Sequence, residues 1–414
     1  MQQTLIAIRR RPLGLLAVFG PGIVVMLADT DVGSVITAGQ SGAAWGYRLL
    51  LLQFVLMPIL YMVQELTVRL GVHTGRGHGE LIRDTFGAFW AWVSVGGMVI
   101  AVIGALLTEF SGVAGVGELY GVPRGVSVGL AAVALLAIVM TGSYRRVERV
   151  AILLGLFEFA FFGVVVAAHP NLHEVVRQAV RIPLANQDYL YLVAANIGAV
   201  IMPWMIFYQQ SAIADKRLRP EHLAAARWDT AIGSVVTQLV MAAILMAVAA
   251  TLHRSDVKVS LNTIGDISGA ITPFLGVTWG HLVFGVGTIG AGMVAAIVAS
   301  LALAWGLGEV AGYRRSLEYK PFEAGWFYGV YAVCVLAGAV LVTYWPNLVS
   351  LNVAVQVMNA LLLPLVLGFL IALAVYALPD STRLRGTYMK LVIAVAVLTT
   401  SLGVFGGLQG IGWF

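Results

Sequence analysis

The sequence predicts an all-helical integral membrane protein that forms one domain over residues 1–414. Composition is the first observation: 60% of the residues are hydrophobic and 11% are charged, whereas a soluble domain has about 25% charged residues. The second observation is a series of apolar segments of about 20 residues, which is the length that crosses a bilayer. The third is that short connections join these segments, so that no separate soluble domain is expected.

Eleven apolar segments are long enough to be membrane spans. The first and the sixth contain residues that interrupt a helix, and the other nine are expected to be continuous helices. The spans cover about residues 18–42, 47–70, 92–117, 124–142, 149–168, 188–211, 228–252, 276–305, 325–345, 350–378 and 388–411.

The positive charges of the connections predict the orientation of these spans. Arg and Lys clusters precede the first span and follow the second, fourth, sixth, eighth and tenth, and cytoplasmic loops are the ones enriched in these residues. All six clusters lie on one side if the N-terminus is cytoplasmic, which places the C-terminus outside. The exceptions are Arg177, Arg181 and a few charges near 254–258. The net charge of +5 therefore requires no nucleic-acid partner.

Residues 28–34, with the sequence ADTDVGS, are the most informative part of the first span. Two carboxylates, Asp29 and Asp31, stand there in apolar surroundings, and a carboxylate at the bilayer centre costs roughly 2.5–3.5 kcal/mol. Asp, Thr, Gly and Ser are poor helix formers and good oxygen donors. Unwound backbone inside a membrane is tolerated only where it is buried in protein or lines a cavity. We interpret this segment as one half of a cation site.

The sixth span contains the second predicted break, in the segment NIGAVIMPW at 196–204. It lies five spans after the first break and has the opposite orientation, as in transporters built from inverted repeats. The repeats are expected to cover about residues 18–168 and 188–378, with an extra helix at about 388–411. The alternative is a proline kink in one span and a glycine-packed contact in the other, but it leaves the two acids unexplained.

These motifs resemble those of the Nramp family of divalent-metal transporters. The resemblance runs from Gly20 to Tyr47 and continues through RLGVHTGRG at 69–77, TEFSG at 108–112 and GAVIMP at 198–203. It covers most of the chain. It implies a LeuT-type fold with two inverted five-helix repeats, broken helices 1 and 6, and one extra C-terminal span, in agreement with the eleven spans.

The resemblance also implies a metal site. The family's first broken helix carries Asp-Pro-Gly-Asn, whose acid and amide bind the metal, and this chain keeps the acid and the glycine. The family's sixth span carries Met-Pro-His with an upstream alanine carbonyl, and some relatives add a glutamine from the tenth span. The matching residues here are Asp31, Gly33, Ser34, Ala199, Met202, Pro203, Trp204 and Gln356.

Several departures from the family pattern concern protons. Relatives that couple metal uptake to protons use the histidine of the sixth span, an acid three residues before the Glu109 position, and arginines on the ninth span. This chain has Trp204 and Leu106 at the first two positions and no Arg or Lys between residues 326 and 344. We therefore predict weak or absent proton coupling. Such replacements resemble the divergent bacterial branch of Nramp-related magnesium transporters.

The expected ligands favour a divalent cation but do not select one. The Asp31 carboxylate, the Ser34 hydroxyl and the Ala199 carbonyl are hard oxygen ligands that suit Mg²⁺ or Mn²⁺. Serine is shorter than asparagine and leaves room for a water, which favours the strongly hydrated Mg²⁺. The Met202 sulfur would instead favour a transition metal, unless the methionine only fills space between the helices.

Asp29, Glu109 and Glu158 are further acids inside the expected spans. Asp29 would face away from Asp31 on a continuous helix, so we weigh two roles for it: an acid that holds waters on the ion, or a capping group at the break. Glu109 is expected to line the permeation path or to pair with a polar neighbour. For Glu158, a structural hydrogen bond between helices is the simplest interpretation.

The sequence thus predicts a bacterial plasma-membrane importer of Mg²⁺, Mn²⁺ or both that works by alternating access. A proton-coupled Mn²⁺/Fe²⁺ importer and a LeuT-type carrier of a small organic solute are the alternatives. We expect no enzymatic activity, no cofactor beyond the transported ion, and a monomer in the lipid bilayer. The single cysteine, Cys334, excludes an internal disulfide.

Overall fold

The computed structural model describes residues 19–252, 261, 265–269, 276–344 and 348–410. In these ranges the chain is helical and has no strand. The positive cluster at 9–11 and the charges near 254–258, which the orientation prediction used, lie outside the described residues. By length and composition, nine helical stretches of the described chain can cross a membrane when α3 and α4 are taken together, and α7 is a shorter apolar helix.

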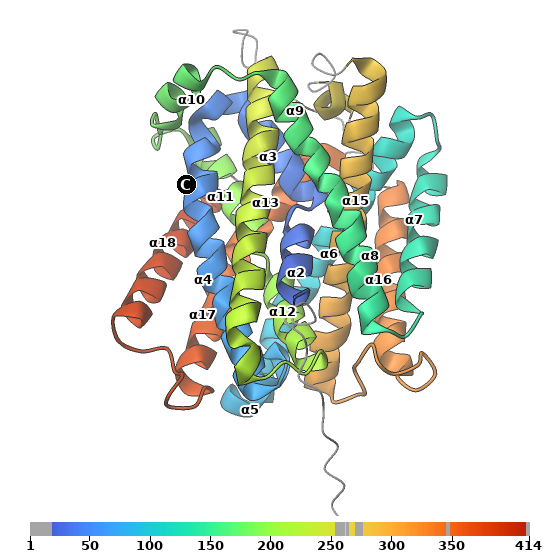
Figure 1. Ribbon diagram of the computed structural model, residues 1–414, viewed down its shortest axis with the longest axis vertical. Coiled ribbons are helices and arrows are strands. Elements are labelled where there is room, and N and C mark those ends of the chain that lie inside the picture. The colour runs from blue at the N-terminus through green and yellow to red at the C-terminus, as the bar shows by residue number, and fades with distance from the viewer. Residues whose placement is uncertain (1–18, 253–260, 262–264, 270–275, 345–347, 411–414) are drawn as a thin grey trace, which may run out of the picture.

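Helices occupy each of the eleven predicted spans (Figure 1). Short helices lie in the connections: η1 (Gly46–Leu49), α5 (His78–Phe86), α10 (Leu172–Ala179) and η3 (Pro220–His222). The spans are formed, in order, by α2 (Pro21–Asp29) with α3 (Val32–Trp45), α4 (Leu50–Thr74), α6 (Ala88–Leu119), α7 (Arg124–Val139), α8 (Tyr144–Gly155) with η2 (Leu156–Phe159) and α9 (Ala160–Ala168), α11 (Gln187–Val200) with α12 (Pro203–Asp215), α13 (Leu223–Leu252), α15 (Val277–Ala311), α16 (Gly325–Tyr344), α17 (Leu348–Tyr376) and α18 (Gly386–Gly410).

The two predicted breaks are confirmed, and local chemistry explains both. Between α2 and α3 the chain turns extended at Asp31 (φ −66°, ψ 170°), whose carboxylate then caps α3. Between α11 and α12 it is extended at Ile201 and Met202. Pro203 follows at the first position of α12, where its missing N–H leaves no hydrogen bond unmade.

A third interruption was not predicted. The fifth span is not a continuous helix, because the short 3₁₀ turn η2 separates α8 from α9. Glu158 lies in this turn and is buried. The residues around it are apolar and give no break signal, so composition alone could not have located the turn.

The broken helix α2–α3 lies at the centre of the molecule. Helix α13 packs along α2, α3 and α4, and α15 packs on α6, α2 and α8. Helices α18 and α7 lie at opposite edges (Figure 1). The α4–α5, α7–α8, α12–α13, α15–α16 and α17–α18 connections all lie at one end, at the bottom of Figure 1, which we call the basic end because it carries the predicted positive clusters.

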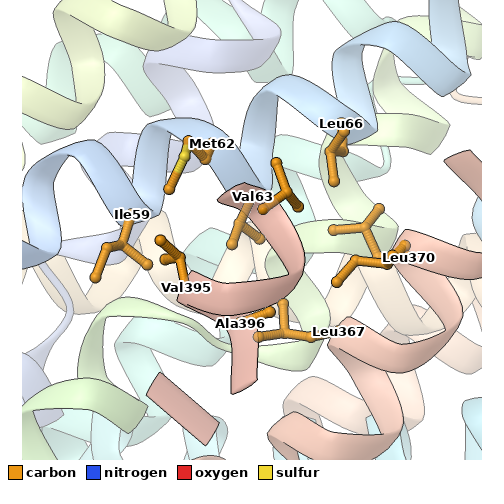
Figure 2. A pocket seen from close by; sticks show the side chains of 10 residues that line it. Ile59, Met62, Val63, Leu66, Leu367, Leu370, Val395 and Ala396 are labelled. Atoms are coloured by element: carbon orange, nitrogen blue, oxygen red, sulfur yellow. The ribbon is translucent and has the colours of Figure 1, made fainter. Parts of the chain in front are cut away.

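The extra helix α18 packs against α11 and α17. A small cavity of about 20 Å³ lies between α4, α17 and α18, and Figure 2 shows the side chains that line it. Side chains of α4 such as Ile59 and Met62 face Leu367 of α17 and Val395 of α18 across it, and every lining side chain is apolar. Because a cavity without polar partners holds no ordered water or ion, this one is a packing defect and not part of an ion path.

Candidate metal centre

The two helix breaks meet at Ser34. Its backbone N–H donates to Asp31 Oδ1 at 2.6 Å, which is the N-cap hydrogen bond of α3. Its hydroxyl donates to the carbonyl oxygen of Ala199 at 2.9 Å, near the end of α11. Asp31 Oδ2 is buried and has no hydrogen-bond partner in the described part of the chain. One carboxylate oxygen and one carbonyl, from opposite halves of the fold, therefore accept hydrogen bonds from the same residue, Ser34.

Glu109 of α6 lies at the start of α3 and pairs with polar neighbours there. Its Oε2 accepts the backbone N–H of Val32 at 3.1 Å, and its Oε1 accepts the hydroxyl of Thr108 at 2.8 Å. The Glu109 carboxyl also lies beside that of Asp31. The amino end of α3 thus holds two carboxylates, as its helix dipole favours. These two adjacent carboxylates supply the negative charge that would neutralise a divalent cation.

Gln356 of α17 completes the cluster. Its Nε2 lies so close above Gly33 that a Cβ there would be 2.0 Å away, and its side chain contacts the Asp31 carboxyl. Its Oε1 accepts the Asn359 side-chain N–H at 3.0 Å. A half-turn of the Gln356 amide would direct its oxygen toward Asp31 instead. Asn359, which sequence reasoning missed, could have been found as the next polar residue on the same face of the tenth span.

Met202, Pro203 and Trp204 form the start of α12 and are fully buried. Met202 lies in the break between α11 and α12, three residues after Ala199, whose carbonyl lies near the end of α11. Trp204 Nε1 has no hydrogen-bond partner among the described residues, and an indole cannot take up a proton. Leu106 lies on α6, one turn before Glu109, and is buried.

Asp29 makes its hydrogen bond with α13. Its Oδ2 accepts the Thr237 hydroxyl of α13 at 3.5 Å, and the adjacent Thr30 hydroxyl lies 2.6 Å from the same Thr237 oxygen. Glu158 lies beside Thr30 on that side. Asp29 therefore caps neither α2 nor α3, and its role toward the ion stays a prediction.

The site is closed toward the end opposite the basic end. Asn196 of α11 donates to Ser41 Oγ of α3 at 2.8 Å and accepts from Gln53 Nε2 of α4 at 2.6 Å. Asp31, Met202 and Gln356 expose none of their surface. An ion could reach or leave this site only if a helix moved.

A second set of contacts holds the start of α2 at the basic end. The Asp229 carboxylate of α13 accepts backbone N–H groups at the start of α2, from Gly20 at 3.2 Å, Gly22 at 2.7 Å and Ile23 at 3.3 Å. Lys216, just after α12, donates to the carbonyl of Phe19 at 2.8 Å. The half-helix α2 is thus tied at its free end to the helices on either side.

The Lys216 ammonium also pairs with Glu148 of α8 at 2.7 Å, and both side chains are only 11% exposed. Nearby, His78 of α5 is buried and its Nδ1 lies 2.9 Å from Gln210 Oε1 of α12. Burial lowers the pKa of His78 to about 4, so the imidazole is neutral at pH 7. These contacts join α5, α8 and α12 around the basic end of α2.

Apart from the Met202 thioether at the second break, the donors of the candidate centre are oxygens. In the described residues, no three His, Cys, Asp or Glu side chains come together as a metal cluster. The atoms that could bind an ion are instead the Asp31 and Glu109 carboxylates, the Ala199 carbonyl, the Ser34 hydroxyl and the Gln356 amide oxygen. Such hard oxygen ligands suit Mg²⁺, Ca²⁺ and Mn²⁺.

Comparisons with known sequences support this interpretation of the motifs. The Nramp family model, described as natural resistance-associated macrophage protein-like, matches residues 22–409. A divalent metal cation transporter MntH of Aeromonas hydrophila is 31% identical over 301 residues, which are 69% of this chain and 72% of the relative. The MntH of Brucella suis is 28% identical over 302 residues, and the match spans 65% of its length.

Solved structures confirm the predicted LeuT-type fold. A manganese transporter of Eremococcus coleocola superposes with a TM-score of 0.76 at 18% identity, over 99% of this chain and 91% of that one. Mhp1, a nucleobase-cation-symport-1 family transporter, superposes with a TM-score of 0.59 at 14% identity, over 97% and 91% of the two chains. The family model over nearly the whole chain, together with the two breaks that meet at Ser34, shows that this chain belongs to the Nramp family.

Proposed function

We propose that this protein imports a divalent metal cation by alternating access, with Asp31 as its central ligand. The contact of Ser34 with both Asp31 and the Ala199 carbonyl is the observation that carries this proposal, because it joins oxygen donors of the two breaks at one point. The relatives named divalent metal cation transporters support the class of substrate. A carboxylate-bearing organic solute fits poorly, because Asp31 and Glu109 would repel it.

Mg²⁺ and Mn²⁺ are the proposed substrates. Mg²⁺ loses its waters reluctantly and is usually bound through few protein ligands. The short Ser34 side chain, in place of the family's asparagine, leaves space for one such water. Met202 is the only soft donor of the proposed set, so a variant without its sulfur should lose preference for Mn²⁺ before it loses Mg²⁺ transport.

Proton coupling is proposed to be weak or absent. Trp204 and Leu106 cannot exchange protons, and the ninth span carries no Arg or Lys between residues 326 and 344. Protons are also not needed to drive uptake. A membrane potential of 100 mV is worth about 2.3 kcal/mol per charge, hence about 4.6 kcal/mol for a divalent cation, or roughly a thousandfold accumulation.

The gates follow from the same geometry. We propose that the basic end faces the cytoplasm of a bacterium, in line with the positive-inside rule, and that the chain works as a monomer. The Asn196 contacts with Ser41 and Gln53 would then form the outer gate. The Asp229 and Lys216 contacts with the start of α2 would form the inner gate, and α2 would move away from α8 and α13 to release the ion.

Uptake of Mn²⁺ into proteoliposomes by the Asp31→Ala variant tests the proposal. We expect the initial rate to fall at least 100-fold, while the purified variant elutes as the wild type does. Glu118→Gln is the matched control, because Glu118 is 47% exposed and pairs with Arg124 far from the site. Uptake by Asp31→Ala at more than half of the wild-type rate would remove Asp31 from the transport site.

A further inference from the structure

Four carboxylates surround the α2–α3 break, and they form two pairs with different partners. Asp31 and Glu109 lie together at the start of α3, where the transported cation would neutralise them. Asp29 and Glu158 lie on the side of α13 and η2. Each of the four side chains is at most 1% exposed. None of them takes part in an ion pair with a Lys or Arg of the described chain.

The second pair lies around two hydroxyl groups. The hydroxyls of Thr30 and Thr237 are 2.6 Å apart, and Thr237 also donates to Asp29 Oδ2 at 3.5 Å. The Glu158 carboxyl reaches the same place from η2 and lies beside Thr30. Three elements, α2, η2 and α13, therefore bring four oxygen-bearing side chains to one buried position.

Glu158 supplies a separate observation that this position is incomplete. It is 1% exposed, it lies against the Thr30 hydroxyl, and its Oε1 has no hydrogen-bond partner among the described residues. Asp29 Oδ1 is likewise buried without a partner in the described chain. Buried polar atoms are nearly always hydrogen-bonded in native proteins, so such exceptions require an explanation. A structural hydrogen bond between helices, the simplest sequence-based interpretation of Glu158, does not occupy Oε1.

We propose that Asp29, Glu158, Thr30 and Thr237 bind a second cation, of the class that prefers hard oxygen ligands. This inference rests on the proposed function in one respect. The two positive charges of a divalent ion at Asp31 and Glu109 balance the two negative charges there, and the charges of Asp29 and Glu158 are left without a counter-ion. Carboxylate and hydroxyl oxygens without nitrogen or sulfur donors exclude a preference for soft metals. Bound among these oxygens, the second cation would hold the last turn of α2 against α13.

Binding stoichiometry tests this proposal without relying on transport. The purified full chain is titrated with Mn²⁺, and free Mn²⁺ is read from its electron paramagnetic resonance signal. A parallel titration uses ²²Na⁺ in a scintillation proximity assay. The variants are a double variant that combines Asp29→Asn with Glu158→Gln and keeps side-chain size, Thr237→Val, and Asp31→Ala. Glu118→Gln, an exposed acid outside the site, is the control.

Two outcomes support the second site. Wild-type protein binds either two Mn²⁺ per chain or one Mn²⁺ and one Na⁺. In either case the double variant loses one ion and binds the other with unchanged affinity, and Thr237→Val weakens the same ion about tenfold. Asp31→Ala removes the other ion, so failure of the transport site and failure of the second site are distinguishable. One Mn²⁺ per wild-type chain without Na⁺ binding, or two ions retained by the double variant, would overturn the proposal.

Discussion

The contact between Asp229 and the start of α2 gives the sharpest prediction about gating. The carboxylate accepts the N–H groups of Gly20, Gly22 and Ile23 and also neutralises the positive end of the α2 dipole. Asp229→Asn keeps the shape but removes the charge and one acceptor oxygen. A hydrogen bond to a charged group is worth about 1.5–3 kcal/mol, so the closed inner gate should lose about that much. The open state should then become roughly 10- to 150-fold more populated.

A cysteine substitution on α2 reports this change. Leu27 is 6% exposed and packs so closely on Gly155 of α8 that a Cβ there would be 2.8 Å from the Leu27 Cβ. In a Cys334→Ser background, Leu27→Cys is labelled from the inner side with a membrane-impermeant thiol reagent. We expect Asp229→Asn to raise the labelling rate by the same factor as the open population, roughly 10- to 150-fold.

Two controls separate gating from unfolding. Asp84→Asn changes the same residue type on the surface of α5, where Asp84 is 36% exposed and pairs with Arg76, and should leave the rate unchanged. Leu135→Cys on α7, at a position that is fully buried and away from α2, should stay unlabelled. An unchanged rate at position 27, or equal increases at 27 and 135, would refute the assignment of Asp229 to the inner gate.

Three further predictions concern packing, pH and protons. In Gly198→Ala the new Cβ would lie 1.8 Å from the backbone oxygen of Gln356. Such overpacking costs about 1–3 kcal/mol, so Tm and Mn²⁺ affinity should both fall, whereas Gly163→Ala, with no neighbour within 4 Å, should change neither. The pKa of His78 is about 4 in the folded protein, below its ordinary 6.5, so the unfolded chain binds the extra proton between these values. The free energy of unfolding should therefore fall by up to about 3 kcal/mol as the pH drops from 6.5 to 4. Tm measured across this pH range should show the fall in the wild type and a smaller fall in His78→Gln. Trp204→His combined with Leu106→Asp should add proton movement to metal uptake, and an unchanged internal pH during uptake would contradict the reasoning from these two positions.

Much of the fold could be predicted because its signals are local. The apolar segments are long enough to predict the spans. Asp31, with its neighbouring glycine and serine, predicts the first break, and Pro203 predicts the second. The interruption at η2 could not be predicted, because no glycine or proline lies in the turn and Glu158 is the only polar residue of an apolar run. The turn η2 packs against α15, and a sequence-based prediction does not include such a contact between distant segments.

The residues that meet around Ser34 were predicted as one set through the family resemblance, but the partner of Asp29 was not. Asp31, Ser34, Ala199 and Gln356 come together in the structure, whereas Asp29 turns to α13. Spacing alone leaves that choice open, because the direction of a side chain at a break depends on the unwound backbone. Asp229 lies 207 residues from Gly22, to whose N–H it binds at 2.7 Å, and no feature of the sequence links such distant positions.

The most direct test of the central claim is Mg²⁺ uptake into proteoliposomes with a clamped membrane potential and no pH gradient. One dye inside reports Mg²⁺, a second reports pH, and Mn²⁺ is added in a competing series. The account predicts uptake that increases with inside-negative potential, is competed by Mn²⁺, and leaves the internal pH unchanged. Mn²⁺ entry that acidifies the interior, with no Mg²⁺ entry, would contradict it and would indicate a proton-coupled transition-metal importer.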